Sequence, residues 1–410
     1  MSIQQPARWK ITEFCLGLLC LLQAAPMDAS AGLLNRLGST SPMGLATSGA
    51  GDHTGVNRGP FNAALNPAAL VTVDGVELYL GDVSLWTDFS YQQHALLGGS
   101  HFEALDENFQ FPEFALGWRI DENWIIAVQL SVPYGLASDF RDMSATFPGY
   151  NTELSDLQTS IAAAYQFNDE FSIGATLNVD YFDLTYRLPV IVGGTFLGHN
   201  SGEADGFGVS GSIGALWRPG NWRLGIKYAF PSTVDIDGHS NLPPALGIVR
   251  DGFSSEIDIP QRIAAGVAYE FTDWWTSAVD VTYTDYEQSD LFVFDYDVAP
   301  NAALPLAWKS VWSIHAGNFI KVTDQLTWKQ GAGWLSSAMP DDVLLPSIPD
   351  TPGWIVSTGL GYEAAEWMTI DVSFAYAWGD RNIGFGLTRP SSGDLHSDIW
   401  LAGIGLNFRF

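Results

Sequence analysis

Large apolar residues and small or polar residues alternate along most of the chain with a period of two. In the last segment, one parity holds Trp400, Ala402, Ile404, Leu406, Phe408 and Phe410, and the other holds Gly403, Gly405, Asn407 and Arg409. The same alternation runs over 171–181, 222–230 and 368–378. Successive side chains of a β-strand point to opposite faces, so this period is typical of strands. The pattern predicts an all-β protein whose final strand extends to the last residue.

The composition of the two faces favours a membrane barrel over a soluble β-sandwich. One face carries large apolar side chains, with aromatic residues toward the strand ends, and the other face is small or polar. A sandwich core also gives alternation, but it does not usually place aromatic residues at both ends of its apolar face. A transmembrane barrel has lipid outside, a wet or plugged lumen inside, and aromatic girdles at both interfaces. We therefore expect the large apolar face to contact lipid.

Short and long connections alternate between the predicted strands. The short connections carry turn-forming residues and lie at 121–123, 168–170, 219–221, 272–273, 322–324 and 364–366. The long polar segments lie near 92–110, 140–155, 193–202, 240–252, 291–304, 339–352 and 382–396. Together these connections join fourteen strands, and an even number places both termini on one side of the membrane. The sequence thus predicts a 14-stranded antiparallel transmembrane β-barrel over residues 76–410, closed so that no strand edge meets lipid.

The first 31 residues are predicted to be a signal peptide. Arg8 and Lys10 precede a short apolar run that ends at Leu22, and an A-x-A cleavage pattern ends at Ala31. Both cysteines of the chain lie in this segment, so we expect no disulfide and no thiolate chemistry in the exported protein.

Residues 32–75 are predicted to form an N-terminal hatch. This segment is rich in Gly, Ser, Ala and Asn and shows no lasting periodicity. The lumen of a fourteen-stranded barrel lies between the filled eight-stranded case and the open sixteen-stranded case. A segment of this length, placed before the first strand, is able to plug such a lumen.

Charge and composition exclude several functional classes. The chain has 46 acidic and 18 basic residues, a formal net charge of −28, which argues against nucleic acid and against a polybasic lipid-binding patch. No apolar run after the N-terminus is long enough for a transmembrane helix. The seven histidines are scattered without metal-ligand spacing, so neither a metal site nor a cofactor is predicted.

An enzyme is the main alternative class for an outer-membrane barrel. Ser313 and His315 lie two residues apart, and outer-membrane phospholipases place a Ser and a His on the barrel exterior. Here Trp312 and Ile314 hold the lipid-facing parity, so Ser313 and His315 are expected to face the lumen. We therefore predict no catalytic residues and no enzymatic activity.

Four segments carry a resemblance to a known family: "ALNPAAL" with Asn66, Pro67 and Ala68, "VPYGLASDF" with Pro133, Tyr134 and Gly135, "PSIPDTPGWIVSTGLGYE", and the terminal "GIGLNFRF". With them the chain resembles the FadL-type outer-membrane transporters of long-chain fatty acids and other hydrophobic compounds. The resemblance spans nearly the whole chain after the signal peptide.

The resemblance implies a passive channel in the Gram-negative outer membrane, with both termini in the periplasm. In that family a hatch occludes the barrel, and ligand passes from the extracellular loops to a site beside the N-terminus of the hatch. A shift of the hatch then opens a route to a gap in the wall where the third strand kinks. The favoured ligand is a long-chain fatty acid. Aromatic or alkane hydrocarbons, and a general diffusion porin, are the alternatives.

The expected partners are a hydrophobic small molecule, outer-membrane lipid and lipopolysaccharide, and the barrel assembly machinery, and the protein is expected to be a monomer. The resemblance places Leu33 and Leu34 near the ligand.

In the predicted third strand, Pro133 donates no ladder hydrogen bond and Gly135 permits a bulge, so a defect is expected there. The alternative is an ordinary bulge near the membrane boundary.

Basic residues in the lumen would help to receive a fatty-acid carboxylate. Parity directs Lys227, Arg262 and Lys329 inward, and Arg187 lies near the end of the fifth predicted strand. Alternatively, each basic residue pairs with a lumen carboxylate, for which Asp180, Glu270 and Asp371 are candidates.

Overall fold

The computed structural model describes residues 39, 41–105, 107–140, 149–192, 195–247, 249–345, 348–386 and 392–410. Its helices are α2 (Pro42–Leu45), α3 (Asn62–Leu65), η2 (Pro67–Thr72), η3 (Ala95–Leu97) and η4 (Pro244–Leu246). Its strands are β1 (Val76–Gln93), β2 (His101–Glu103), β3 (Glu107–Arg119), β4 (Trp124–Phe140), β5 (Tyr150–Gln166), β6 (Phe171–Val192), β7 (Thr195–Trp217), β8 (Trp222–Ala229), β9 (Ser232–Asn241), β10 (Arg250–Ile259), β11 (Gln261–Thr272), β12 (Trp275–Asp285), β13 (Leu291–Tyr296), β14 (Ala302–Pro305), β15 (Val311–Lys321), β16 (Leu326–Leu335), β17 (Gly353–Ala365), β18 (Met368–Ile383) and β19 (Gly393–Arg409). No helix among these residues is long and apolar enough to cross a membrane.

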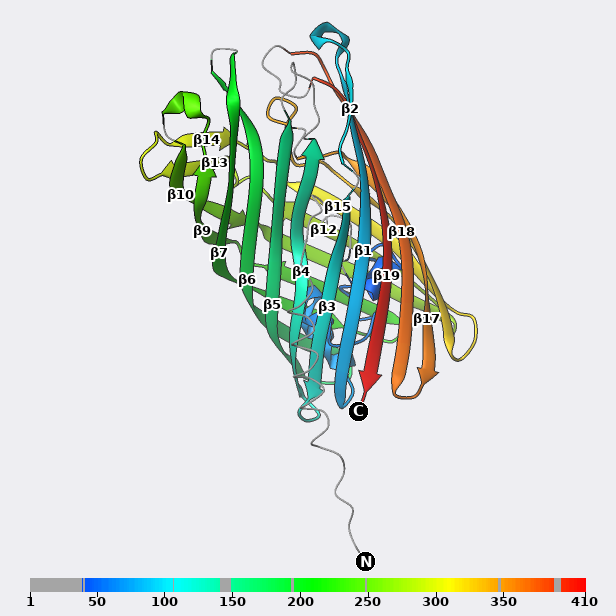
Figure 1. The fold of residues 1–410 in the computed structure, drawn as a ribbon. Helices are drawn as coiled ribbons and strands as arrows, with labels where there is room; N and C mark the ends of the chain where they lie inside the picture. The colour runs from blue at the N-terminus through cyan, green and yellow to red at the C-terminus, as the bar shows by residue number, and fades with distance from the viewer. Residues whose placement is uncertain are drawn as a thin grey trace, which may run out of the picture.

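The strands close into one antiparallel barrel, which Figure 1 shows from the side. Strands β8 and β9 are two halves of one barrel strand, because β7 pairs with both. Strands β10 and β11 are two halves of the next barrel strand, because β10 pairs with β9 and β11 pairs with β8. Strands β2, β13 and β14 are short additions at the end of the barrel that carries the long loops. The described residues therefore form a 14-stranded barrel, which confirms the prediction.

The barrel closes between its first and last strands. β1 pairs with β19 from Glu77 opposite Arg409 to Gln93 opposite Gly393. Beyond that ladder, the backbone N–H of Phe410 donates to the carbonyl oxygen of Val76 at 2.9 Å. The C-terminus accordingly lies beside the start of β1 in Figure 1. The pairing of Phe410 with Val76 thus extends the seam one residue beyond the β1–β19 ladder.

The outer surface carries the face that the alternation assigned to lipid. On β6, Ile173 and Leu177 are exposed, whereas Ser172 and Thr176 between them are buried. Exposed aromatic residues gather near the short turns, as at Trp118, Trp124, Trp217, Trp222, Trp274 and Trp367, and a second group lies nearer the long loops, as at Trp86, Phe207, Trp312, Trp354 and Trp400. Two aromatic bands flanking an apolar band are typical of barrels in lipid.

The short turns form as their residue types predict. The Oδ1 atom of Asp121 accepts hydrogen bonds from the backbone N–H groups of Asn123 and Trp124, both at 2.8 Å. Asn168 makes the equivalent bonds to Glu170 and Phe171, both at 2.9 Å. These side chains replace the missing backbone partners of a tight turn.

Two predicted loops were wrong in part. Residues 195–202 belong to β7, which pairs with β6 almost to its tip, and 291–304 contains the paired strands β13 and β14. The segment 195–202 is largely small and polar, whereas 291–304 starts with the apolar run LFVF, which the loop prediction overlooked. Strands that extend beyond the membrane have water on their outer face, so their composition no longer separates them from loops.

The hatch, defined here as residues 41–75, lies inside the barrel, where Figure 1 shows it in blue behind β3 to β5. Its short helices α2, α3 and η2 are mostly buried. Glycines on the inner face of the wall allow its backbone to approach closely. A Cβ added to Gly225 would lie 1.7 Å from the carbonyl oxygen of His53, and one added to Gly214 would lie 2.1 Å from Oδ1 of Asn66.

Candidate ligand pocket and hatch contacts

The third barrel strand, β4, contains a bulge at Val132 and Pro133. Ser131 lies opposite Gln158 on β5, but Tyr134 lies opposite Asp156, so β4 advances three residues while β5 advances two. Proline is tolerated at such a position because it has no N–H to donate to the ladder.

Above the bulge, β4 no longer pairs with β3. The β3–β4 ladder runs from Arg119 opposite Ile125 only as far as Phe114 opposite Leu130. Beyond it, β3 continues to pair with β1, and β4 with β5. The N–H of Leu105 donates to the Asp139 carbonyl at 2.9 Å near the long-loop end. The wall therefore has an interval without a backbone ladder between β3 and β4.

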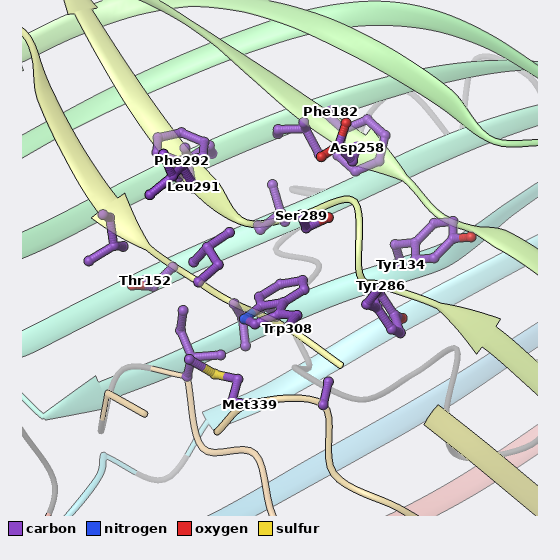
Figure 2. Close-up of a pocket in the computed structure, with 18 of the residues that line it drawn as sticks. Tyr134, Thr152, Phe182, Asp258, Tyr286, Ser289, Leu291, Phe292, Trp308 and Met339 are labelled. Carbon is purple, nitrogen blue, oxygen red and sulfur yellow. The ribbon is translucent and has the colours of Figure 1, made fainter. Parts of the chain in front are cut away.

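An apolar pocket begins directly after the bulge. Tyr134, Gly135 and Leu136 line one side of it, together with inward residues of β5 and β6. The opposite side comes from 256–260 and from segments between β12 and β17. Figure 2 shows Phe182, Phe292, Trp308 and Met339 around the cavity, whose volume is about 200 Å³. Of the predicted kink residues, Tyr134 and Gly135 line this pocket, and Pro133 lies in the bulge beside it.

The Asn66-Pro67-Ala68 motif makes hydrogen bonds both within the hatch and to the barrel wall. Asn66 is fully buried, and its Nδ2 donates to the carbonyl oxygens of His53 at 2.8 Å and Ala215 at 3.3 Å. Its Oδ1 accepts from the N–H of Ala68 at 3.1 Å and caps η2, in which Pro67 is the first residue. On β6, the hydroxyl of Ser172 donates to the Ala68 carbonyl at 3.0 Å.

A second wall contact is built around Asp280 on β12. Its Oδ2 accepts from the N–H of Gly51 at 2.5 Å, and its Oδ1 lies 2.8 Å from Nδ1 of His53 and accepts from the His53 N–H at 3.2 Å. A carboxylate that receives several hydrogen bonds from one segment holds that segment strongly.

The basic residues predicted to receive a carboxylate are engaged elsewhere. Lys227 is buried, and its Nζ donates to the carbonyl oxygen of Ala64 in the hatch. Nζ of Lys329 lies 2.8 Å from Oδ1 of Asp371, which is one of the carboxylate partners considered from the sequence.

Arg187 lies on the outward parity of β6, with Nη2 3.1 Å from Nδ1 of His199 on β7. Arg262 is the second residue of β11, and it interacts electrostatically with Tyr134, which lines the pocket. None of these four basic residues lines the pocket. Leu33 and Leu34, the other predicted ligand contacts, lie outside the described residues.

Sequence reasoning did not identify most of the pocket. Phe182, Asp258 and Trp308 come from distant parts of the chain, and no local motif marks them. Asp258 lies on the outward parity of β10, opposite the exposed Thr233, and the inward parity changes from odd to even residues only after Pro260.

Ser313 and His315 lie on the inner face and are buried, as their parity predicted. Both ring nitrogens of His315 lack a hydrogen-bond partner among the described residues, so no Ser–His pair forms. Among all residues that the structure describes, no group of three or more His, Cys, Asp or Glu has the arrangement to hold a metal ion.

Comparison with known proteins places this architecture in context. A family model described as "Outer membrane protein transport protein (OMPP1/FadL/TodX)" matches residues 21–410. A curated relative, the long-chain fatty acid transport protein of Escherichia coli O6:H1, is 22% identical over 91% of this chain and 93% of its own length.

Two solved structures share the fold. A Pseudomonas aeruginosa FadL homologue is similar with a TM-score of 0.77 and 18% identity, over 90% of this chain and 98% of its own. The Pseudomonas putida toluene transporter TodX is similar with a TM-score of 0.73 and 16% identity, over 91% of this chain and 99% of its own. Both are barrels of the same design, and at these identities the likeness concerns the fold alone.

Proposed function

Because the chain belongs to the outer membrane protein transport family (OMPP1/FadL/TodX), whose members are transport channels and not enzymes, we propose that it is a hatch-gated passive channel with a lateral exit. It is an outer-membrane transporter of hydrophobic compounds. In our proposal, ligand enters the apolar pocket from the long-loop side, and the hatch blocks the direct path through the lumen. Ligand then leaves through the wall between β3 and β4.

One observation carries the proposal: the apolar pocket begins on β4 just beyond the point where pairing with β3 ends. Tyr134 follows the bulge and lines the pocket, while Phe114 and Leu130 form the last β3–β4 pair below it. The cavity volume of about 200 Å³ exceeds the roughly 150 Å³ of an engineered cavity that binds benzene. An aromatic ring or a segment of an alkyl chain therefore fits.

The Escherichia coli relative is named as a long-chain fatty acid transport protein, and TodX is named as a toluene transporter. Both classes remain compatible with an apolar pocket, because such pockets discriminate poorly between ligands of similar shape. We further propose that the protein lies as a monomer in the lipid and lipopolysaccharide of the outer membrane. In this proposal both termini are periplasmic and the barrel assembly machinery inserts the chain.

Removing the bulge tests the lateral exit. Deletion of Pro133 would leave one residue on each strand, Val132 and Leu157, between the pairs on either side. The β4–β5 ladder would then become regular, and β4 would be free to pair further with β3. We expect a folded barrel with cellular uptake of a labelled hydrophobe reduced at least tenfold.

The matched control is deletion of Leu197, the extra residue of the bulge between β6 and β7. That deletion should leave uptake unchanged. Normal uptake by the Pro133 deletion, with folding verified by heat-modifiable migration in electrophoresis, would overturn the lateral route.

A further inference from the structure

The pocket wall contains one buried polar group that has no partner. Trp308 lines the cavity, and its indole Nε1 is buried without a hydrogen-bond acceptor among the described residues. Buried indole N–H groups usually have an acceptor, because an unpaired N–H has lost its hydrogen bond to water and gained nothing in exchange. The N–H of Trp308 is therefore able to gain a hydrogen bond from a ligand in the pocket.

Other polar side chains of the pocket are already paired. The hydroxyl of Tyr186 hydrogen-bonds to Ser240. Oδ2 of Asp350 accepts from the backbone N–H of Met339 at 2.7 Å. Among the lining residues that the structure describes, Trp308 alone has a buried side-chain nitrogen or oxygen without a partner. A ligand that enters therefore meets one unsatisfied buried donor in a mainly apolar wall.

The backbone around Trp308 is fixed in an unusual conformation. Ala307 has a φ of 47°, in the left-handed region that residues with a Cβ rarely adopt. Its N–H donates to the carbonyl oxygen of Asp290 at 3.0 Å. On the other side of Trp308, the N–H of Lys309 donates to the carbonyl oxygen of Ala338 at 2.8 Å. Residues in such conformations persist only where their surroundings hold them, and they gather at ligand sites. The segment therefore presents the indole ring in one orientation.

The neighbouring aromatic ring does not take the place of the missing acceptor. The rings of Trp308 and Tyr286 meet edge to face, with centroids 5.5 Å apart. Figure 2 shows the nitrogen of Trp308 on the side of its ring that lies away from Tyr286. The N–H is thus not directed at the face of the tyrosine ring, and its acceptor has to come from a molecule that enters the pocket.

From these observations we propose that the indole N–H of Trp308 donates to an oxygen atom of the ligand, so that the pocket favours hydrophobic molecules with an oxygen acceptor over hydrocarbons of the same size. The inference rests on the proposed transport function and narrows its ligand class. A hydrocarbon leaves the N–H unpaired, whereas a hydroxyl or carboxylate oxygen replaces the bond that the group made with water. A site that hydrogen-bonds its ligand discriminates against analogues that lack the bonding group, because its own buried polar atom is then left unpaired.

Matched photoreactive probes test the proposal. Analogues of hexadecanol, palmitate and heptadecane, which share an alkyl chain and differ at its end, would be applied to the purified full-length protein. Mass spectrometry would then measure labelling of the pocket peptides. For each probe the wild type is compared with Trp308→Phe, which keeps an aromatic ring and removes the N–H. This comparison cancels differences in how the probes partition into detergent.

We expect Trp308→Phe to lose about fivefold of its labelling by hexadecanol, which is the effect of one neutral hydrogen bond, and to keep its labelling by heptadecane. A loss with palmitate as well would support the proposal with a carboxylate as a further acceptor. A loss with hexadecanol alone would support it with a hydroxyl as the acceptor.

The control variant is Phe292→Leu, because Phe292 lines the same pocket and carries no polar side-chain atom. It changes the shape of the cavity without changing its hydrogen bonding, so labelling by all three probes should change to the same extent. Nuclear magnetic resonance gives a second readout on the wild type. The indole proton signal of Trp308, assigned by its absence from Trp308→Phe or Trp308→Tyr, should move further downfield with hexadecanol than with heptadecane.

Equal losses of hexadecanol and heptadecane labelling in Trp308→Phe, or an indole signal that both molecules shift alike, would overturn the role of Trp308 and leave the transport proposal standing. Absence of pocket labelling by every probe in the wild type would instead overturn the transport proposal itself, and this inference with it.

Discussion

Asp280 on the barrel wall and His53 in the hatch are joined twice, through the backbone N–H of His53 at 3.2 Å and through its ring Nδ1 at 2.8 Å. The same carboxylate holds the N–H of Gly51 at 2.5 Å. Three contacts on one side chain make Asp280 the strongest single attachment of the hatch to β12. The permeability of the barrel should therefore respond to this residue.

Asp280→Asn should loosen the hatch. The substitution removes the charge and one acceptor, and hydrogen bonds to charged groups contribute about 1.5–3 kcal/mol each. We expect the ion conductance of single barrels in planar bilayers to rise several-fold. The control is Asp285→Asn at the end of β12, because Asp285 bonds to Gln261 and Ser310 instead of the hatch. Unchanged conductance in a folded Asp280 variant would count against a hatch held by this contact.

Asn66→Ala combined with Pro67→Ala should produce a smaller leak than removal of the hatch. The change deletes the side-chain bonds to His53, Ala215 and Ala68 and releases the φ constraint at the start of η2. Swelling of proteoliposomes in sugars measures the effect: the wild type should not swell, and the variant should swell slowly. Asn221→Ala, in a short turn, is the control. Rapid swelling by the wild type would favour a general diffusion porin.

Gly225→Ala should displace the hatch by steric contact alone. A Cβ there would lie 1.7 Å from the His53 carbonyl oxygen, which is too close for any real contact, and Gly225 needs no unusual φ. The backbone of the hatch must move, so conductance should rise although no polar group is lost. Gly211→Ala is the control, because its nearest neighbour is the Thr176 carbonyl at 3.0 Å on the adjacent strand. Equal conductance of both variants would contradict close packing of hatch and wall.

These contacts explain which features were predictable. The alternation that ends at Phe410 and the turn at Asp121 depend on residues adjacent in sequence, so local chemistry determines them. The hatch was predicted as a segment, but its contacts were not. The glycines at 214 and 225 were interpreted as part of a polar, small-residue lumen, whereas their role is close packing against Asn66 and His53.

The pocket was not predictable because it depends on defects in the alternation. The bulge at Pro133 was expected, but the direction in which Tyr134 points after it depends on how β4 re-pairs with β5. Pro260 likewise separates β10 from β11 and changes which parity faces inward, so counting from β10 would misplace the residues of β11. Arg187 has the outward parity of β6, so counting parity would have placed it outside the lumen. It contacts His199 on β7.

The orientation of the barrel is testable on intact cells. Long connections lie at one end and short turns at the other, and in outer-membrane barrels the long loops face outward. A protease added outside should cut, if anywhere, in the long connections, such as residues 297–301 between β13 and β14. The turns at 168–170 and 272–273 should be cut only after the outer membrane is permeabilised. Cleavage at those turns in intact cells would reverse the proposed orientation and place the termini outside.

Deletion of Phe410 should impair assembly of the barrel. The residue exchanges two backbone hydrogen bonds with Val76, at 2.9 Å and 3.4 Å, and its exposed ring lies on the lipid-facing parity. Each backbone bond contributes about 1 kcal/mol net, and the barrel assembly machinery would lose the terminal aromatic residue that we propose it recognises. We expect the folded fraction in the outer membrane, measured by heat-modifiable migration in electrophoresis, to fall several-fold.

Two substitutions separate the roles of Phe410. Phe410→Tyr keeps both the backbone bonds and an aromatic ring, so it should assemble normally. Phe410→Ala keeps only the backbone bonds, so assembly should fall if the ring is recognised and should stay normal if seam closure alone matters. Wild-type assembly of the deletion would show that neither the two bonds to Val76 nor the terminal ring is needed. The strand would then end at Phe410 for a reason unrelated to closure, because the ladder up to Arg409 opposite Glu77 would already suffice.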